Sequence, residues 1–211
     1  MKNFLLIDDH EIVRSGVKNV LQALFKPCEI YEAKDEKSVL SELKARSYDL
    51  VIMDVQMPDT DTAGLMDYIK TRYPDLKVLM FSMSAENVYA KRFLKAGAMG
   101  FVSKNSGLTE LKKAIELVLN DRKYISEDLA EQLAGEIGSK QPNNPFDKLS
   151  AREFEIANLL ILGKSGSDIS ELLSINSSTV GTHKARLFEK LHVSNLAELI
   201  EVARIYKLNF V

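Results

Sequence analysis

The stretch Leu50-Val-Ile-Met-Asp54 decides the fold of this 211-residue chain. Four apolar residues followed by a carboxylate are too few for a helix, and such a run is typical of a strand buried on both faces. Four more short apolar runs lie within the first 123 residues, at 4–7, 29–33, 77–81 and 100–102. The run at 50–53 is therefore predicted to be the third of five buried strands.

Longer segments with the apolar spacing of helices separate these runs, at residues 12–25, 37–46, 63–73, 86–96 and 108–119. Alternation of this kind implies a parallel sheet with helices on both faces and right-handed crossovers. Residues 1–123 are thus expected to form a five-stranded, doubly wound α/β domain. Ligands of such domains bind at the carboxyl ends of the strands.

The rest of the chain has a different character. Ser126 is expected to cap a short helix that reaches residue 137, and a Pro/Asn-rich stretch at 138–145 is typical of a linker. Helical patterns follow at 154–162, 166–173, 177–191 and 195–206, with no strand pattern. The predicted organisation is an α/β domain at 1–123, a linker with a short helix at 124–145, and an all-α four-helix domain at 146–211.

Composition narrows the class of protein. Hydrophobic residues make up 45% and charged residues 27%, as in soluble globular proteins. The N-terminal MKNFLLIDDHE reaches carboxylates too early for a secretory signal, and no apolar run is long enough to span a bilayer. Cys28 has no second cysteine to pair with. We expect a cytoplasmic protein that does not contact a membrane.

Polar residues gather where the predicted strands end. Asp8 and Asp9 follow the first run and Asp54 ends the third, so all three reach the ligand-binding edge. Three carboxylates repel one another unless a cation neutralises them, and oxygen ligands suit Mg²⁺. Ser82 and Lys104 end the fourth and fifth runs, and they add a hydroxyl and an ammonium to the cluster.

This set of side chains predicts phosphoryl chemistry. Asp54 is the expected nucleophile, which would form an acyl phosphate. Mg²⁺ and Lys104 would neutralise charge on the transferred group, and Ser82 would donate a hydrogen bond to it. Acidic residues at strand ends often serve only to keep loops soluble. That alternative does not explain why groups suited to phosphoryl transfer stand at the ends of four strands.

Four segments resemble the receiver domains of two-component response regulators: Ile7–His10, Val51–Pro58, Met80–Ser82 and Lys95–Lys104. The resemblance implies a flavodoxin-like fold and a sensor histidine kinase that phosphorylates Asp54. It implies Mg²⁺ bound by Asp9, Asp54 and the backbone carbonyl of Gln56, with Asp8 near or at the metal, and a switch pair of Ser82 and Phe101. It implies no enzyme activity beyond self-phosphorylation from a phosphodonor and autodephosphorylation.

Two features are particular to this chain. The loop Asp59–Ala63 is longer than the family pattern and lies beside the expected phosphorylation site, which points to unusual kinase fit or hydrolysis. Gln56 and Ser84 occupy positions that tune the lifetime of the acyl phosphate in that family.

The C-terminal domain contains a helix-turn-helix pattern. Ser150 with Glu153, and Ser165 with Asp168, have the spacing of capping boxes, and a turn at 174–176 separates a short helix from a longer one. On the longer helix Val180, Leu187 and Leu191 form the apolar stripe. The opposite face and one shoulder hold the candidate DNA contacts: Thr179, Gly181, Thr182, His183, Lys184, Ala185, Arg186 and Lys190.

Charge does not decide whether this helix binds DNA. Lys184, Arg186 and Lys190 would neutralise phosphates, with Thr179 and Thr182 as short polar contacts. However, residues 146–211 carry eight basic and eight acidic residues, so an ordinary solvated helix face is the alternative. His183 is as readily explained by a structural role.

Short segments between Leu149 and Leu191 resemble the LuxR-type output domain, and the whole chain except the linker resembles the NarL subfamily of response regulators. Those segments are Leu149–Glu153, Gly163–Ser165, Asp168–Ile169 and Thr179–His183, followed by Lys190 and Leu191. The resemblance implies a homodimeric transcription factor that binds double-stranded promoter DNA. Gly181, Thr182 and Ala185 match positions that often read bases, but they are small here, which favours readout of DNA shape.

The expected mechanism is that phosphorylation of Asp54 promotes dimerisation or releases the DNA-binding helix from the receiver. Two other classes remain open at this point. One is an aspartyl-phosphate phosphotransferase or phosphatase, for which His10 is the nearest acid–base candidate. The other is a protein-binding regulator whose helix-turn-helix does not bind DNA.

Overall fold

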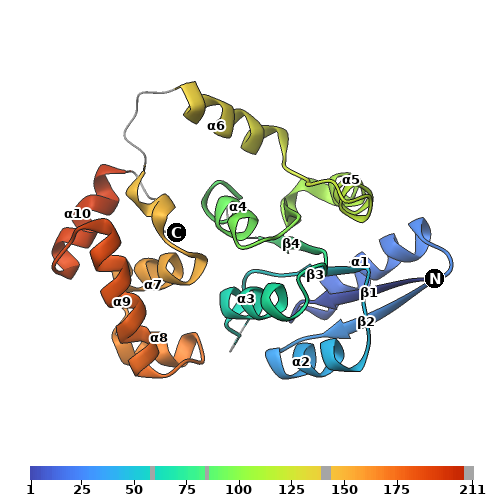
Figure 1. Ribbon diagram of the computed structural model, residues 1–211, viewed down its shortest axis with the longest axis horizontal. Helices are drawn as coiled ribbons and strands as arrows, with labels where there is room; N and C mark the ends of the chain where they lie inside the picture. The colour runs from blue at the N-terminus through green and yellow to red at the C-terminus, as the bar shows by residue number, and fades with distance from the viewer. Residues whose placement is uncertain (58–59, 84–85, 139–143, 207–211) are drawn as a thin grey trace. The chain divides into compact units, whose positions relative to one another are not determined.

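A computed structural model describes residues 1–57, 60–83, 86–138 and 144–206. The chain divides into two compact units, Met1–Ser139 and Lys140–Val211 (Figure 1). No helix in the described part of the chain is long and apolar enough to cross a membrane.

The first unit is built on five parallel strands in the order β2-β1-β3-β4-β5. This is the five-stranded doubly wound sheet predicted from the sequence, and the predicted strands agree with it to within two residues at either end. The strands are β1 (Lys2–Ile7), β2 (Cys28–Ala33), β3 (Leu50–Met53), β4 (Val78–Ser82) and β5 (Gly100–Ser103). Since β1 and β3 are neighbours, the ends of these two strands lie side by side.

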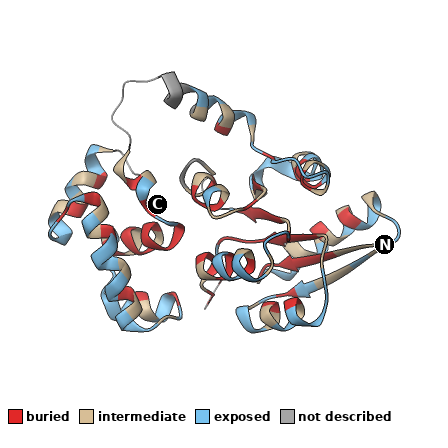
Figure 2. Ribbon diagram, in the orientation of Figure 1, coloured by how far each residue is buried: buried red, intermediate tan, exposed pale blue. Residues whose placement is uncertain are grey.

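Helices cover both faces of this sheet. The helices are α1 (Glu11–Leu24), α2 (Glu36–Ala45), α3 (Thr62–Arg72), α4 (Glu86–Lys95) and α5 (Gly107–Leu119). Alternate strand residues such as Phe4 and Leu6 join one core with Val17 of α1 and Leu111 of α5. Figure 2 shows that the strands are largely buried while the outer helix faces are exposed. Burial on both faces explains the continuous apolar runs of β3 and β4. The edge strand β2 contains two glutamates and is mostly half-buried or exposed, so the prediction that this segment is a fully buried strand is wrong.

The first unit continues past residue 123. Tyr124 is buried, forms an isolated parallel bridge with Gly100 of β5, and donates a hydrogen bond from its hydroxyl to Glu110 of α5 at 2.6 Å. Ser126 caps α6 (Glu127–Gly138), and Leu129 of this helix is buried. The predicted linker began at residue 124, whereas the structure packs Tyr124 and Leu129 with the first unit. The domain boundaries themselves stay predictions.

The second unit is helical throughout its described residues. A short 3-10 helix η2 (Pro145–Lys148) precedes α7 (Ala151–Ile161), α8 (Gly166–Leu172), α9 (Ser177–Leu191) and α10 (Leu196–Ile205). Ser150 and Ser165 form the two predicted capping boxes, at the starts of α7 and α8. Phe154 of α7, Ile169 of α8 and Leu187 of α9 are fully buried. The predicted four-helix domain is therefore confirmed, with α8 and α9 as its helix-turn-helix.

Candidate functional site

The pocket at the edge of the first sheet begins with two buried carboxylates. Ile7 of β1 pairs in register with Met53 of β3, and the Asp54 N–H donates to the Ile7 carbonyl at 2.9 Å. The next residues, Asp8 and Asp54, therefore leave the sheet side by side, and both are at most 5% exposed. Two carboxylates buried this close repel each other unless a cation lies between them.

Lys104 supplies that cation. Its Nζ lies 2.6 Å from Asp8 Oδ2 and 2.6 Å from Asp54 Oδ2, and its side chain is only 8% exposed. Burial lowers the pKa of the Lys104 ammonium, but the hydrogen bonds to Asp54 and Asp8 raise it more, so the pKa lies above that of an ordinary lysine. Lys104 therefore stays charged at physiological pH and holds the two carboxylates together.

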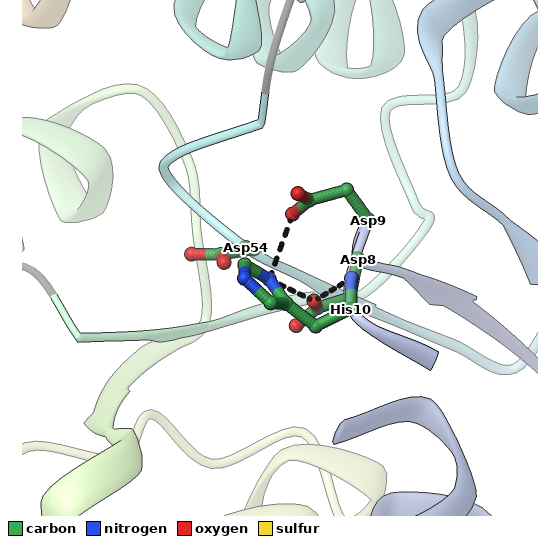
Figure 3. Close-up of side chains that lie close together, drawn as sticks. All are labelled: Asp8, Asp9, His10 and Asp54. Atoms are coloured by element: carbon green, nitrogen blue, oxygen red, sulfur yellow. Dashed lines mark hydrogen bonds and ion pairs between the residues drawn. The ribbon is translucent and has the colours of Figure 1, made fainter. Parts of the chain in front are cut away.

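Asp9 and His10 complete the pocket on its open side (Figure 3). The His10 Nδ1 lies 3.0 Å from Asp9 Oδ1, and the Asp9 side chain is more exposed than those of Asp8 and Asp54. One ligand atom from each of Asp8, Asp9, His10 and Asp54 lies within 4.8 Å of the others. Three of the four donors are carboxylate oxygens, a set that fits Mg²⁺.

His10 is the pocket residue whose place the sequence did not indicate. Its position next to Asp8 and Asp9 was the only available signal, and it suggested an acid–base group rather than a neighbour of the metal ligands. In the structure its backbone N–H donates to Asp8 Oδ1 at 2.9 Å. His10 therefore helps to orient Asp8.

Gln56 follows β3, Ser82 ends β4 and Phe101 lies in β5. The Gln56 N–H donates to Asp54 Oδ1 at 3.2 Å, so its backbone runs beside the expected phosphoacceptor. Ser82 is fully buried at the end of β4. Phe101, in the adjacent strand β5, is also fully buried. The carbonyl ligand and the switch pair remain predictions.

The longer loop is only partly described. Residues 58 and 59 lie outside the described residues, as does Ser84. Of the remainder, Thr60 and Thr62 are buried, and Asp61 caps α3 by accepting a hydrogen bond from the Gly64 N–H at 2.8 Å. The end of this loop is thus a helix cap.

Helix α9 carries the predicted DNA contacts. Val180, Leu187 and Leu191 are buried, which confirms the predicted apolar stripe. Among the predicted DNA contacts, Gly181, Thr182, Lys184, Ala185 and Arg186 are exposed, while Thr179, His183 and Lys190 are half-buried. The Thr182 hydroxyl donates to the Ser178 carbonyl at 3.0 Å, and the Lys184 ammonium lies 5.4 Å from the Phe188 ring centre.

Lys190 has a contact that the sequence did not indicate. Its Nζ lies 2.6 Å from Oε2 of Glu153, a carboxylate at the start of α7 whose side chain is 4% exposed. The same oxygen accepts from the Ser150 N–H at 2.8 Å. Lys190 therefore joins α9 to α7, which leaves Lys184 and Arg186 as the exposed cations among the predicted contacts.

These features define a class: an α/β domain with a buried carboxylate pocket, joined to a helix-turn-helix domain. Comparison with known families supports it, because residues 4–116 match the response regulator receiver domain and residues 147–203 match bacterial regulatory proteins of the luxR family. The chain belongs to the response regulators that carry a receiver domain followed by a LuxR-type DNA-binding domain.

Relatives with the same organisation span almost the whole chain. Response regulator GacA of Pseudomonas viridiflava is 35% identical over 204 residues, which cover 96% of this chain and 95% of GacA. Response regulator UvrY of Escherichia coli (strain K12) is 31% identical over 204 residues, which cover 96% of this chain and 94% of UvrY.

A solved structure has the same fold. It contains RcsB from Salmonella enterica serovar Typhimurium bound to promoter rprA in the presence of the phosphomimetic BeF3−. Its TM-score is 0.69 at 25% identity, and the match covers 95% of this chain and 97% of RcsB.

Proposed function

We propose that this protein is a transcription factor switched by phosphorylation of Asp54. A sensor histidine kinase donates the phosphoryl group: its phosphohistidine N–P bond breaks, and a bond forms between phosphorus and a carboxylate oxygen of Asp54. The observation that carries this assignment is the bridge from Lys104 to Asp54 and Asp8. The Asp54 carboxylate is thus buried in a pocket that already holds the Lys104 ammonium and has oxygen ligands for a second cation.

Each pocket residue has a part in the transfer. The residues that would hold Mg²⁺ are Asp8, Asp9, Asp54 and Gln56 through its carbonyl, and the ion would neutralise charge on the phosphoryl oxygens. Lys104 moves its contact from the Asp54 carboxylate to a phosphoryl oxygen, and Ser82 donates a hydrogen bond to another. The same pocket accepts phosphoryl groups from small phosphodonors and loses them by hydrolysis.

The added charge shifts the equilibrium between two conformations of the receiver. A phosphoryl group adds roughly −1.5 to −2 charges beside Lys104 and the metal. In this switch Ser82 moves toward the phosphoryl group, and Phe101 turns into the space that Ser82 leaves. The receiver then favours a state that dimerises or frees the DNA-binding unit.

The output is binding of double-stranded promoter DNA by α9. The luxR-family match and the exposed Lys184 and Arg186 support this step. Two subunits of a homodimer place their α9 helices on adjacent half-sites, and RcsB, a relative in fold, is bound to a promoter in its structure. A regulator of bacterial promoters acts in the cytoplasm.

Mass spectrometry of the intact chain tests the phosphoacceptor. Wild type and Asp54→Asn are incubated with Mg²⁺ and acetyl phosphate or a phosphorylated histidine kinase. We expect wild type to gain the mass of one phosphoryl group, labile to base, and the variant to gain none. An unmodified wild-type chain with both donors, or an equally modified Asp54→Asn chain, overturns the proposal.

A further inference from the structure

Arg14 of α1 contacts the backbone of the carboxylate pocket. Its Nη1 donates to the main-chain carbonyl of Asp8 at 2.7 Å. Its Nε donates to Glu32 Oε2, near the end of β2, at 2.9 Å. The Arg14 side chain is 13% exposed and the Glu32 side chain 33%, so the hydrogen bond to Asp8 is partly buried while the one to Glu32 is exposed.

The carbonyl that Arg14 holds belongs to the peptide unit between Asp8 and Asp9. The Asp8 N–H is held by the Ala33 carbonyl at 3.1 Å, and Asp8 Oδ1 accepts from the His10 N–H at 2.9 Å. With its N–H, its side chain and its carbonyl all bonded, Asp8 has one backbone orientation. A peptide unit is planar, so the direction of the Asp8 carbonyl also fixes where the chain enters Asp9.

Glu32 holds the guanidinium in place. Glu32 Oε1 accepts from Lys18 Nζ at 3.0 Å, while Oε2 accepts from Arg14. The hydrogen bonds from Arg14 and then from Lys18 keep the pKa of Glu32 below its usual range, so the carboxylate stays charged at physiological pH. Arg14 therefore connects β2, α1 and the turn that bears the metal ligands.

We propose that Arg14 is a positioning residue for Mg²⁺: by fixing the Asp8–Asp9 peptide it aims the Asp9 carboxylate at the ion. This inference rests on the Mg²⁺ site proposed above. Partners one step removed from the metal typically change metal affinity by about 10- to 100-fold when they are lost. We therefore expect Arg14→Gln to weaken Mg²⁺ binding by about 10-fold.

Electrostatics makes the opposite prediction, which sharpens the test. Arg14 is a cation near a cation site, so removing its charge lowers the repulsion felt by Mg²⁺ and favours tighter binding. Lys18→Gln removes the same charge from the same Glu32 cluster but leaves the hydrogen bond to Asp8. Only a positioning role makes Arg14→Gln weaken binding while Lys18→Gln leaves it unchanged or slightly tighter.

The experiment is a Mg²⁺ titration of the full-length unphosphorylated protein, followed by amide NMR shifts of Asp9 and His10. Wild type, Arg14→Gln, Arg14→Lys and Lys18→Gln are compared. Arg14→Lys keeps one donor for the Asp8 carbonyl but cannot bond Asp8 and Glu32 together with the geometry of a guanidinium. We therefore expect its affinity for Mg²⁺ to be intermediate. The rate of phosphorylation by acetyl phosphate is then measured against Mg²⁺ concentration for the same proteins.

For Arg14→Gln we expect half-saturation at a higher Mg²⁺ concentration and recovery of the wild-type rate at saturating Mg²⁺. A general loss of structure would instead lower the rate at every concentration. Equal Mg²⁺ affinity of Arg14→Gln and wild type, or tighter binding by the variant, overturns the inference and leaves the site intact. If wild type itself does not bind Mg²⁺, the proposed metal site fails as well.

Discussion

At the scale of single residues, Lys104 determines whether the pocket can exist without metal. Two carboxylates whose side chains are 7% and 5% exposed share its ammonium, so its loss leaves two buried carboxylates without their shared cation. Removal of one partner from a buried ion pair typically costs roughly 3–5 kcal/mol. The chemistry of the pocket and the stability of the receiver therefore depend on the same side chain.

We predict that Lys104→Met lowers the free energy of unfolding of the receiver by roughly 3 kcal/mol in the absence of divalent cations. Amide hydrogen exchange in β1 and β3 measures this change. Asp54→Asn removes one of the two carboxylate charges, so the double variant should lose less than the sum of the single losses. Additive losses would mean that Lys104 and Asp54 do not stabilise each other.

Gly181 is a second informative residue, because a glycine inside a helix costs roughly 0.5–1 kcal/mol relative to alanine. Apart from its chain neighbours and the backbone of its own helix, no described residue lies within 4 Å of a Cβ added there. We predict that Gly181→Ala raises the free energy of unfolding of the second unit by that amount, measured by hydrogen exchange in α9. Ala185→Gly, on the same exposed face, should do the reverse; a destabilised Gly181→Ala chain would contradict this account.

At the scale of elements, the contact between α7 and α9 depends on Glu153. Burial raises the pKa of Glu153, but the hydrogen bonds from Lys190 and Ser150 lower it by more, so the net pKa lies below that of an ordinary glutamate. The folded unit therefore binds this proton less readily than the unfolded chain. The stabilisation is fully present above the ordinary glutamate pKa of about 4.3 and is lost as pH falls through the lower folded value.

We predict that Lys190→Met destabilises the second unit by roughly 1–3 kcal/mol at neutral pH, because Glu153 stays buried without its cation. Without Lys190 the pKa of Glu153 rises, because burial then opposes only the hydrogen bonds from Ser150. The difference in stability between wild type and variant should therefore shrink as the solution is acidified, which urea unfolding at a series of pH values measures. A difference independent of pH would show that Lys190 does not act through Glu153.

The element order could be predicted because its causes are local. Leu50–Met53 is continuously apolar since β3 is buried on both faces, and Ser150 and Ser165 cap helices through residues three positions away. The carboxylate pocket could also be predicted from the sequence, because the strand ends of a parallel sheet meet at one edge.

Contacts between distant residues could not be predicted in this way. Arg14 of α1 contacts Asp8, which follows β1, and Glu32 of β2. Lys190 reaches Glu153 across 37 positions of sequence. Lys190 accordingly looked like a phosphate contact, since an exposed and a paired lysine have the same pattern in sequence. Tyr124 looked like the start of a linker because its bridge to Gly100 depends on the folded sheet.

At the scale of the whole molecule, the two units have separate tasks. The receiver pocket has the groups for phosphoryl transfer, and the second unit has the exposed face of α9. The net charge of −2 provides no general attraction to DNA, so binding depends on local contacts. Control of binding by phosphorylation is then a coupling free energy between two distinct sites.

The most direct test of this coupling is the affinity of the full-length protein for promoter fragments selected from its genomic DNA. It is measured with and without acetyl phosphate and Mg²⁺, beside Asp54→Asn and Arg186→Gln. We predict that phosphorylation tightens binding by wild type by a factor of about 5 to 150, the usual range of allosteric coupling, and leaves Asp54→Asn unchanged. Arg186→Gln should take up phosphate normally but bind DNA weakly in both states. A wild-type chain that is phosphorylated on Asp54 yet binds the same fragments with unchanged affinity would contradict the central claim.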